Sequence, residues 1–182
     1  EAGVRCYLMM PRIFRKEAEQ YFRKQMDLLK NAGFDALGIG SMEEPGFLKE
    51  AGIGLPLFFD QGMYSWNHLA GEAMKQYGAD RLTVPVELNE REIRDSGIHG
   101  EMIVYGYLPM MISAQCIRKT TLGCSGKPEI MWLKDRKEMR FPVVNQCRFC
   151  YNTIYNSAPL SLLGLSASVE GLGPKALRLN FT

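Results

Sequence analysis

The chain has 182 residues, of which 46% are apolar and 23% are charged, and its formal net charge is +2. A chain of this length and composition can bury one ordinary core, which excludes a disordered tail, a fibrous repeat and a small disulfide-stapled protein. No apolar run approaches the roughly 20 residues that a membrane-spanning helix needs. The amino-terminal segment also lacks the layout of a secretory signal. We therefore expect a cytoplasmic protein with no membrane partner.

Both ends of the chain lie in or next to strand-like segments, and the first residue is Glu1 rather than Met. This predicts a piece of a longer protein, whose remainder would be a partner of this chain.

Short apolar segments alternate with helical patterns over the first hundred residues. The expected strands are 5–10, 36–39, 55–59, 81–86 and 102–107, and the expected helices are 14–32, 45–51, 67–77 and 89–96. Strands that are apolar on both faces and alternate with helices indicate a parallel sheet. Because a complete (β/α)₈ barrel needs about 250 residues, we predict an α/β fold with a partial TIM-like barrel over 1–107, of about four βα units and a fifth strand. An open doubly wound sheet is the alternative, but no phosphate-binding glycine motif supports a nucleotide fold.

The pattern changes after Tyr107. Segments 130–133 and 139–144 flank a turn and predict a small hairpin, which lies inside a cysteine-rich region assigned to 108–163. Within that region, 151–163 is expected to form a helix interrupted at Ala158 and Pro159. A return segment, 164–182, contains a further expected strand at 176–181.

Four of the five cysteines fall within 35 residues and predict a metal site. Cys116, Cys124, Cys147 and Cys150 have the spacing C-x7-C-x22-C-x2-C. Four thiolates can bind zinc or an iron–sulfur cluster, and the hairpin between the two pairs would bring them together. Free thiols or a redox disulfide remain the alternative. Cys6 is expected to be an ordinary core residue.

Several motifs together resemble the U32 peptidase family, also called collagenase-like proteases. They are YGYLPMMISAQCIRKTTLGC, LKDR, FPV, C-x2-C-YNTIYNS and PLSLL in the second half, with Met10–Ile13, Asn67 and Glu87–Asn89 in the first half. The best resemblance is to the long branch, in which another domain interrupts the conserved unit.

The resemblance implies a barrel with a four-cysteine site, which is a [4Fe-4S] cluster in several members, and it suggests the four cysteines as its ligands. It implies two chemistries: proteolysis, and oxygen-independent hydroxylation of RNA or of ubiquinone precursors. We expect a fragment of an iron–sulfur-dependent modifying enzyme of the RNA hydroxylation type. The alternatives are a collagenase-like peptidase, and a non-catalytic module in which a metal such as zinc is structural. The isolated chain need not be active.

In a barrel, residues that follow the strands face the active site. Those residues are Arg12, Ser41, Asp60, Gln61, Glu87 and Tyr107. We take Asp60, Glu87, Arg12 and Tyr107 as catalytic candidates, and Gln115, Arg118, Arg148 and Asn67 as substrate-binding candidates. Each could instead be a cap or a structural charge. His68 and His99 lack any protease motif.

The segment 116–148 holds eight lysines and arginines against three acids. It also contains Trp132 and Phe141, with Phe149 directly after it, and basic residues with aromatics are what a single-stranded RNA partner needs. Solvated charges over core aromatics are the simpler interpretation. A partial barrel also has open sheet edges, which makes a homodimer a further expectation.

Overall fold

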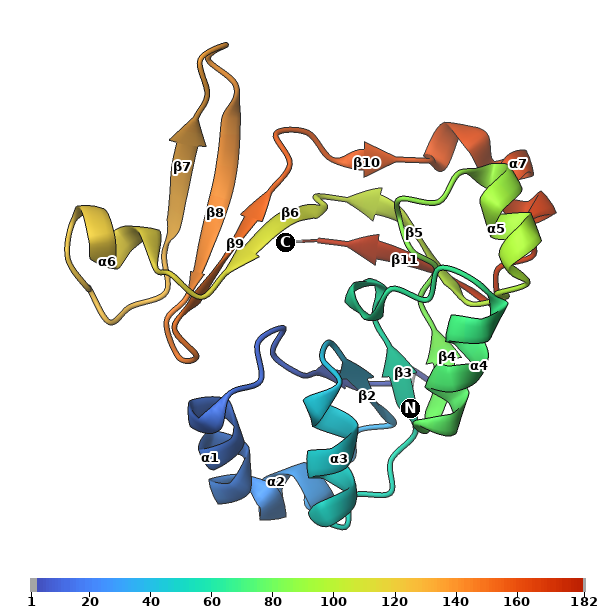
Figure 1. Cartoon of the computed structure of the whole chain (residues 1–182), viewed down its shortest axis with the longest axis horizontal. Coiled ribbons are helices and arrows are strands. Elements are labelled where there is room, and N and C mark those ends of the chain that lie inside the picture. Colours follow the sequence, from blue (N-terminus) through green and yellow to red (C-terminus); the bar gives the residue numbers. More distant parts are fainter. Residues whose placement is uncertain (1–2, 182) are drawn as a thin grey trace. The chain divides into compact units, whose positions relative to one another are not determined.

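The structure is a computed structural model that describes residues 3–181. These residues divide into two compact units. Unit 1 contains 3–103 and 165–178, and unit 2 contains 104–164 and 179–181. Each unit is described by itself (Figure 1).

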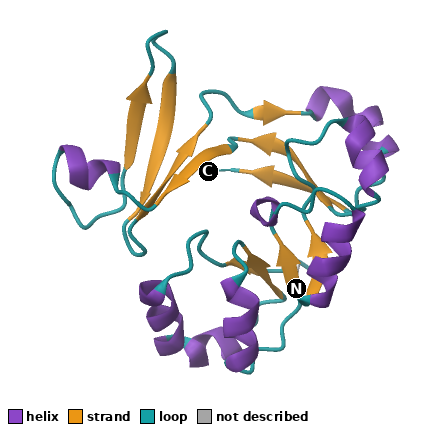
Figure 2. Ribbon diagram, viewed as in Figure 1, coloured by secondary structure: helices purple, strands orange, loops and turns teal. Residues whose placement is uncertain are grey.

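Unit 1 is built on a parallel sheet whose strands follow the order of the chain. The strands are β1 (Tyr7–Met9), β2 (Ala36–Ile39), β3 (Leu57–Phe59) and β4 (Ala79–Leu82). The helices of this unit are α1 (Lys16–Lys24), α2 (Met26–Asn31), α3 (Glu43–Glu50), α4 (His68–Gln76), α5 (Glu90–Ser96) and α7 (Ser166–Gly171), with a 3₁₀ turn, η1 (Gln61–Met63). Helices and strands alternate through unit 1 (Figure 2).

The centre of the unit 1 sheet is closely packed because β2 has no exposed face. Leu37 and Ile39 are completely buried. Between them, Gly38 leaves no room for a side chain, because an added Cβ would lie 2.3 Å from the Sδ of Met9. A strand that is apolar on both faces is typical of a parallel sheet covered by helices.

The parallel pairing continues beyond β4. Thr83 pairs in parallel with Glu101, where β5 (Glu101–Gly106) begins. The mixed α/β fold is confirmed. Closure of these strands into part of a barrel stays a prediction.

The long helix expected over 14–32 is two helices. α1 ends at Lys24 and α2 begins at Met26, with Gln25 between them. The buried stripe is retained, since Ala18, Phe22 and Leu29 are all buried. Among residues 3–181 no helix is long and apolar enough to cross a membrane.

Unit 2 is dominated by an antiparallel sheet of order β6-β9-β8-β7. Its strands are β6 (Pro109–Ser113), β7 (Ile130–Lys134), β8 (Arg140–Gln146) and β9 (Tyr151–Tyr155), and α6 (Ile117–Thr121) lies between β6 and β7. β7 and β8 form the expected hairpin, in register from Ile130 opposite Val144 to Lys134 opposite Arg140. A second sheet has the order β10-β5-β11, with β10 (Leu160–Ser161) antiparallel to β5 and with β11 (Ala176–Asn180). A short 3₁₀ turn, η2 (Leu163–Leu165), precedes α7.

The helix expected over 151–163 is wrong. Residues 151–155 form β9, which pairs with β8 on one side and β6 on the other. Tyr151, Thr153, Ile154 and Tyr155 are aromatic or β-branched residues, which favour a strand. Because this segment lies between β6 and β8, its backbone N–H and carbonyl groups form hydrogen bonds to those two strands. In a helix the same groups would have bonded within the segment.

Candidate functional site

The four clustered cysteines all lie in the turns and loops around one end of the antiparallel sheet of unit 2. Cys116 is the N-cap of α6, and Cys124 lies in the loop after that helix. Cys147 and Cys150 lie in the turn between β8 and β9. Cys150 has a left-handed backbone with φ of 54°, which is uncommon for a residue with a side chain. The β7–β8 hairpin thus places the second cysteine pair near the first. A metal held by these four cysteines stays a prediction.

All four cysteines line one small cavity. Its volume is about 40 Å³, and its other lining residues are Lys119, Gly126, Asn145 and Tyr151. A single water needs about 10–15 Å³ of such space. The cavity therefore has room for something larger than one water, and the four cysteines make up half of its lining residues.

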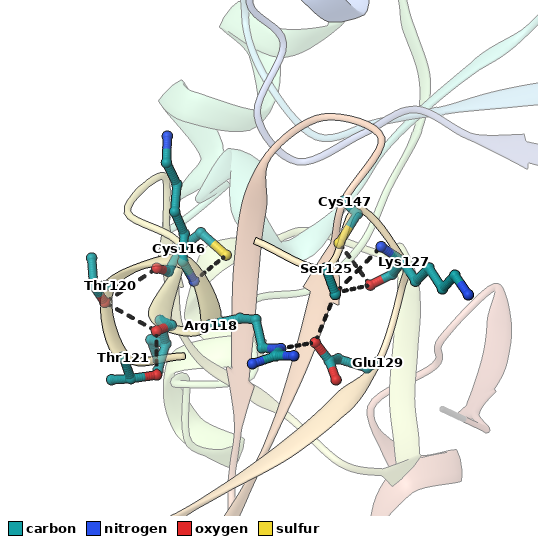
Figure 3. Close-up of polar contacts among 10 residues, drawn as sticks. Cys116, Arg118, Thr120, Thr121, Ser125, Lys127, Glu129 and Cys147 are labelled. Atoms are coloured by element: carbon teal, nitrogen blue, oxygen red, sulfur yellow. Dashed lines mark hydrogen bonds and ion pairs between the residues drawn. The ribbon is translucent and has the colours of Figure 1, made fainter. Parts of the chain in front are cut away.

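Two of the sulfurs have hydrogen bonds to the backbone around them (Figure 3). The thiol of Cys147 donates to the carbonyl of Lys127 at 2.9 Å, and the sulfur of Cys116 accepts from the backbone N–H of Lys119 at 3.5 Å. Burial raises the pKa of the Cys147 thiol, and the nearby Cys116, Cys124, Glu129 and Cys150 raise it further. Four thiolates in this place repel one another, so they need a cation in order to ionise together.

The donor set fits a metal, although the side chains are not assembled into a finished site. Within residues 3–181, no three His, Cys, Asp or Glu side chains are close enough to form one. Sulfur donors are those that zinc and iron–sulfur clusters prefer. Asn145 also lines the cavity, and the two polar atoms of its buried side-chain amide have no hydrogen-bond partner among the described residues. Cys6 lies outside this group. Its strand pattern predicted a core residue, and that prediction is wrong, because Cys6 is exposed.

The substrate-binding candidates beside the cysteines have structural partners or lie at the surface. Arg118 forms an ion pair with Glu129 at 2.5 Å, and Glu129 also accepts from the hydroxyl of Ser125 at 3.0 Å (Figure 3). The carbonyl of Gln115 accepts from the amide of Asn152 at 2.7 Å, so the backbone of Gln115 is fixed while its side chain is exposed. Arg148 is exposed in the turn between Cys147 and Cys150. Tyr107 follows β5 and is half-buried.

In unit 1, two of the catalytic candidates belong to one buried ion-pair network. Arg12 follows β1 and Asp60 follows β3. Nη1 of Arg12 lies 3.0 Å from Oδ2 of Asp60, and Nη2 of Arg178 lies 2.5 Å from Oδ1 of the same carboxylate. Nε of Arg178 is also 3.0 Å from Oε1 of Glu101, without the geometry of a hydrogen bond. The Asp60 side chain is only 8% exposed. Because both of its oxygens are paired, Asp60 is better placed to position two arginines than to accept a proton.

Two glycines make room for the Arg12 side chain. A Cβ at Gly62 would lie 2.1 Å from Nη2 of Arg12, and a Cβ at Gly40 would lie 3.1 Å from its Cδ. The arginine therefore lies across the backbone that follows β2 and β3. Its contact with Asp60 depends on the absence of a side chain at position 62.

The other candidates in unit 1 do not join this network. Glu87 is exposed, and among the described residues its side chain has no hydrogen bond or ion pair. Asn67 is the N-cap of α4, where its Oδ1 accepts from the N–H of Ala70 at 2.9 Å. Ser41 and Gln61 each have a buried side-chain oxygen that lacks a partner in the part of the chain that the structure describes.

Sequence reasoning missed one buried acid, Glu44. It is completely buried, and its Oε2 accepts from the N–H of Gly40 at 2.8 Å and of Ser41 at 3.3 Å. Burial raises the pKa of Glu44 to about 8, against the lowering effect of these hydrogen bonds. The carboxyl is thus largely protonated at neutral pH. A Glu in the first turn of a helix predicts an exposed cap, so the sequence carried no signal for this burial.

Arg178 was also missed. The alternation of ALRLN predicts a strand, and in a strand with one buried face the leucines are expected inside. The structure has the reverse arrangement, with Leu177 57% and Leu179 47% exposed and the Arg178 side chain 18% exposed. Two acids that are remote in sequence explain it, since Arg178 forms ion pairs with Asp60, 118 residues away, and with Glu101.

Comparison with curated proteins and with solved structures gave no significant match in either case. Comparison with family models matched residues 1–170 to peptidase family U32. That match covers almost the whole chain, and its range contains all four cavity cysteines and all of the strand-end candidates named above. The chain therefore belongs to peptidase family U32.

Proposed function

We propose that Cys116, Cys124, Cys147 and Cys150 hold an iron–sulfur cluster, and that the full-length protein is a modifying enzyme of the RNA hydroxylation type. One observation carries the proposal: four cysteines from separate parts of unit 2 line a single cavity. Cysteines serving only as small packing residues would have no reason to line one cavity in this way.

The chain's own residues prepare this cavity for a cationic group. The raised pKa of Cys147 keeps its thiol protonated until positive charge arrives, so binding releases protons and its affinity increases with pH. The carbonyl of Lys127 holds the Cys147 thiol, and the N–H of Lys119 is directed at the Cys116 sulfur. When bound, an iron–sulfur cluster supplies one-electron transfer.

An exposed aromatic residue on the hairpin supports an RNA substrate. Trp132 on β7 is 61% exposed, so it does not belong to the core that the simpler interpretation requires. Lys134 is on the same face of β7, and its cross-strand neighbour is Arg140. An aromatic ring beside cations can stack a base and hold its phosphate.

A peptidase is the second candidate, and the family description favours it. Proteolysis requires an activated nucleophile, a carboxylate pair or a metal with an open position. Asp60 is already paired on both oxygens, which is a poor arrangement for activating water. A zinc ion held by the same four cysteines would instead have a structural role, because closed four-sulfur zinc sites are structural.

Two assays of the full-length protein separate these functions. A hydroxylated nucleoside that is missing from the RNA of a deletion strain, and restored by the wild-type gene and by Cys6→Ser but not by Cys116→Ser, supports the modifying enzyme. Hydrolysis of casein or gelatin that is lost in Cys116→Ser, with unchanged RNA, supports the peptidase. Unchanged RNA without proteolysis leaves the structural role.

A further inference from the structure

The side chain of Asn145 is buried with its hydrogen-bonding capacity unused. Asn145 lies on β8 and is 1% exposed, and neither its Oδ1 nor its Nδ2 has a partner among the described residues. Its backbone, in contrast, is fixed, since its N–H donates to the carbonyl of Glu129 at 3.1 Å. A buried amide without partners destabilises a fold, because the hydrogen bonds that it made to water are not replaced. A polar side chain at this buried position therefore needs an explanation other than stability.

The cross-strand neighbour of Asn145 does not satisfy it. Asn145 pairs in register with Asn152 of β9. The Nδ2 of Asn152 donates to the carbonyl of Gln115, next to Cys116, and its Oδ1 also lacks a partner in the described part of the chain. An acceptor on the facing strand is therefore left unused by Asn145. The Asn152 amide thus holds the backbone of Gln115, which precedes Cys116. The Asn145 amide forms no such hydrogen bond within the described part of the chain.

Asn145 lines the same cavity as the four cysteines. We propose that Asn145 is a positioning residue whose side-chain amide donates a hydrogen bond to the metal group held by those cysteines, at a sulfur atom. This inference rests on the proposed function. Donors to the sulfurs tune the affinity and the potential of such groups, and their loss typically weakens metal binding by about 10–100-fold.

The inference predicts opposite effects of one substitution on the metal-free and the metal-loaded protein. Asn145→Leu keeps a similar volume and removes both polar atoms, so the metal-free full-length protein should have a higher thermal midpoint. The same variant, once loaded, should lose its metal to a chelator about tenfold faster or more. Its midpoint potential should also be lower, because a hydrogen bond donated to sulfur favours the reduced state.

Asn145→Asp is the second variant, since it keeps the shape of the side chain, removes the N–H donors and adds negative charge. It should also lose metal faster than the wild type. Asn31→Leu is the matched control: Asn31 lies in unit 1, and its amide donates to the carbonyl of Asp27. It should retain metal as the wild type does.

The possible results are distinguishable. A wild-type protein without any metal overturns the proposed function, and the inference with it. A metal-holding wild type whose retention and potential are unchanged in both Asn145 variants overturns the inference alone. Destabilisation of the metal-free protein by Asn145→Leu would also overturn it, because that result would mark an ordinary structural amide.

Discussion

Arg178 donates to Asp60 at 2.5 Å across 118 residues of sequence. The arginine lies on β11, near the end of the chain, and the aspartate directly follows β3. Arg12, after β1, contacts the other oxygen of the same carboxylate. One buried acid thus connects three separate segments of unit 1. Removing this acid or one of its arginines should lower the free energy of unfolding.

Replacing Arg178 should destabilise the protein. Arg178→Met leaves Glu101 without its cation and Asp60 with one arginine instead of two. Breaking a buried ion pair from one side costs about 3 kcal/mol, measured as the free energy of unfolding in urea. Arg91→Met is the control, because the Arg91–Asp95 pair is 90% and 72% exposed and is expected to contribute less than about 0.5 kcal/mol. Equal effects of the two substitutions would show that the network is not stabilising.

Adding one methyl group at position 62 should disturb the Arg12–Asp60 contact. The Cβ of Gly62→Ala would overlap the Arg12 guanidinium, so the arginine must move, at a cost of about 1–2 kcal/mol. In an Arg12→Ala background the same substitution should cost little. Gly46→Ala in α3 is the control, since nothing lies within 4 Å of the added atom and alanine stabilises a helix by about 0.5–1 kcal/mol. An equal loss with and without Arg12 would contradict the assignment.

Glu44 should make stability fall as the pH rises. Its pKa is about 8 in the folded chain against an ordinary 4.5. Between these values the folded state holds a proton that the unfolded state has lost, so the free energy of unfolding decreases, by at most about 1.4 kcal/mol per pH unit. Glu44→Gln retains an oxygen for the N–H groups of Gly40 and Ser41 and should flatten this dependence. A pH profile that is equally steep in wild type and variant would show that Glu44 is not its source.

The exposed ring of Trp132 should contribute to RNA binding. Stacking on one aromatic side chain supplies about 1–3 kcal/mol per base, so Trp132→Ala should weaken the binding of full-length protein to single-stranded RNA by about tenfold. Trp66 is the matched control, because it is 47% exposed but lies in unit 1. If Trp66→Ala weakens binding as much as Trp132→Ala, or neither does, the hairpin is not the RNA surface.

Periodicity predicted the elements that depend on local sequence. The strand at Ala36–Ile39 has the expected bounds, because a short apolar run that is buried on both faces has no competing pattern. The hairpin of β7 and β8 was also predicted, because two strand-like segments flank a turn in the local sequence. The break at Gln25 was not, since the apolar stripe continues across it.

The errors lie where distant parts of the chain decide the structure. The segment Tyr151–Tyr155 is a strand because β6 and β8 flank it, and its own sequence does not reveal them. The cysteine spacing predicted that the four cysteines would come together, and all four line one cavity, although among the described residues no three of their side chains are close enough to form a metal site. The spacing could not predict Asn145 at that cavity or Arg178 at Asp60, because each depends on a pairing between segments that are remote in sequence.

The most direct test of the account is an absorption spectrum with iron, sulfide and zinc analysis of the full-length protein purified without oxygen. If the four cysteines hold an iron–sulfur cluster, the protein should be brown and contain about four iron and four sulfide per chain. The colour should be lost in Cys147→Ser and kept in Cys6→Ser. A colourless protein that contains no metal, even after reconstitution with iron and sulfide, and that has all four thiols free would contradict the account.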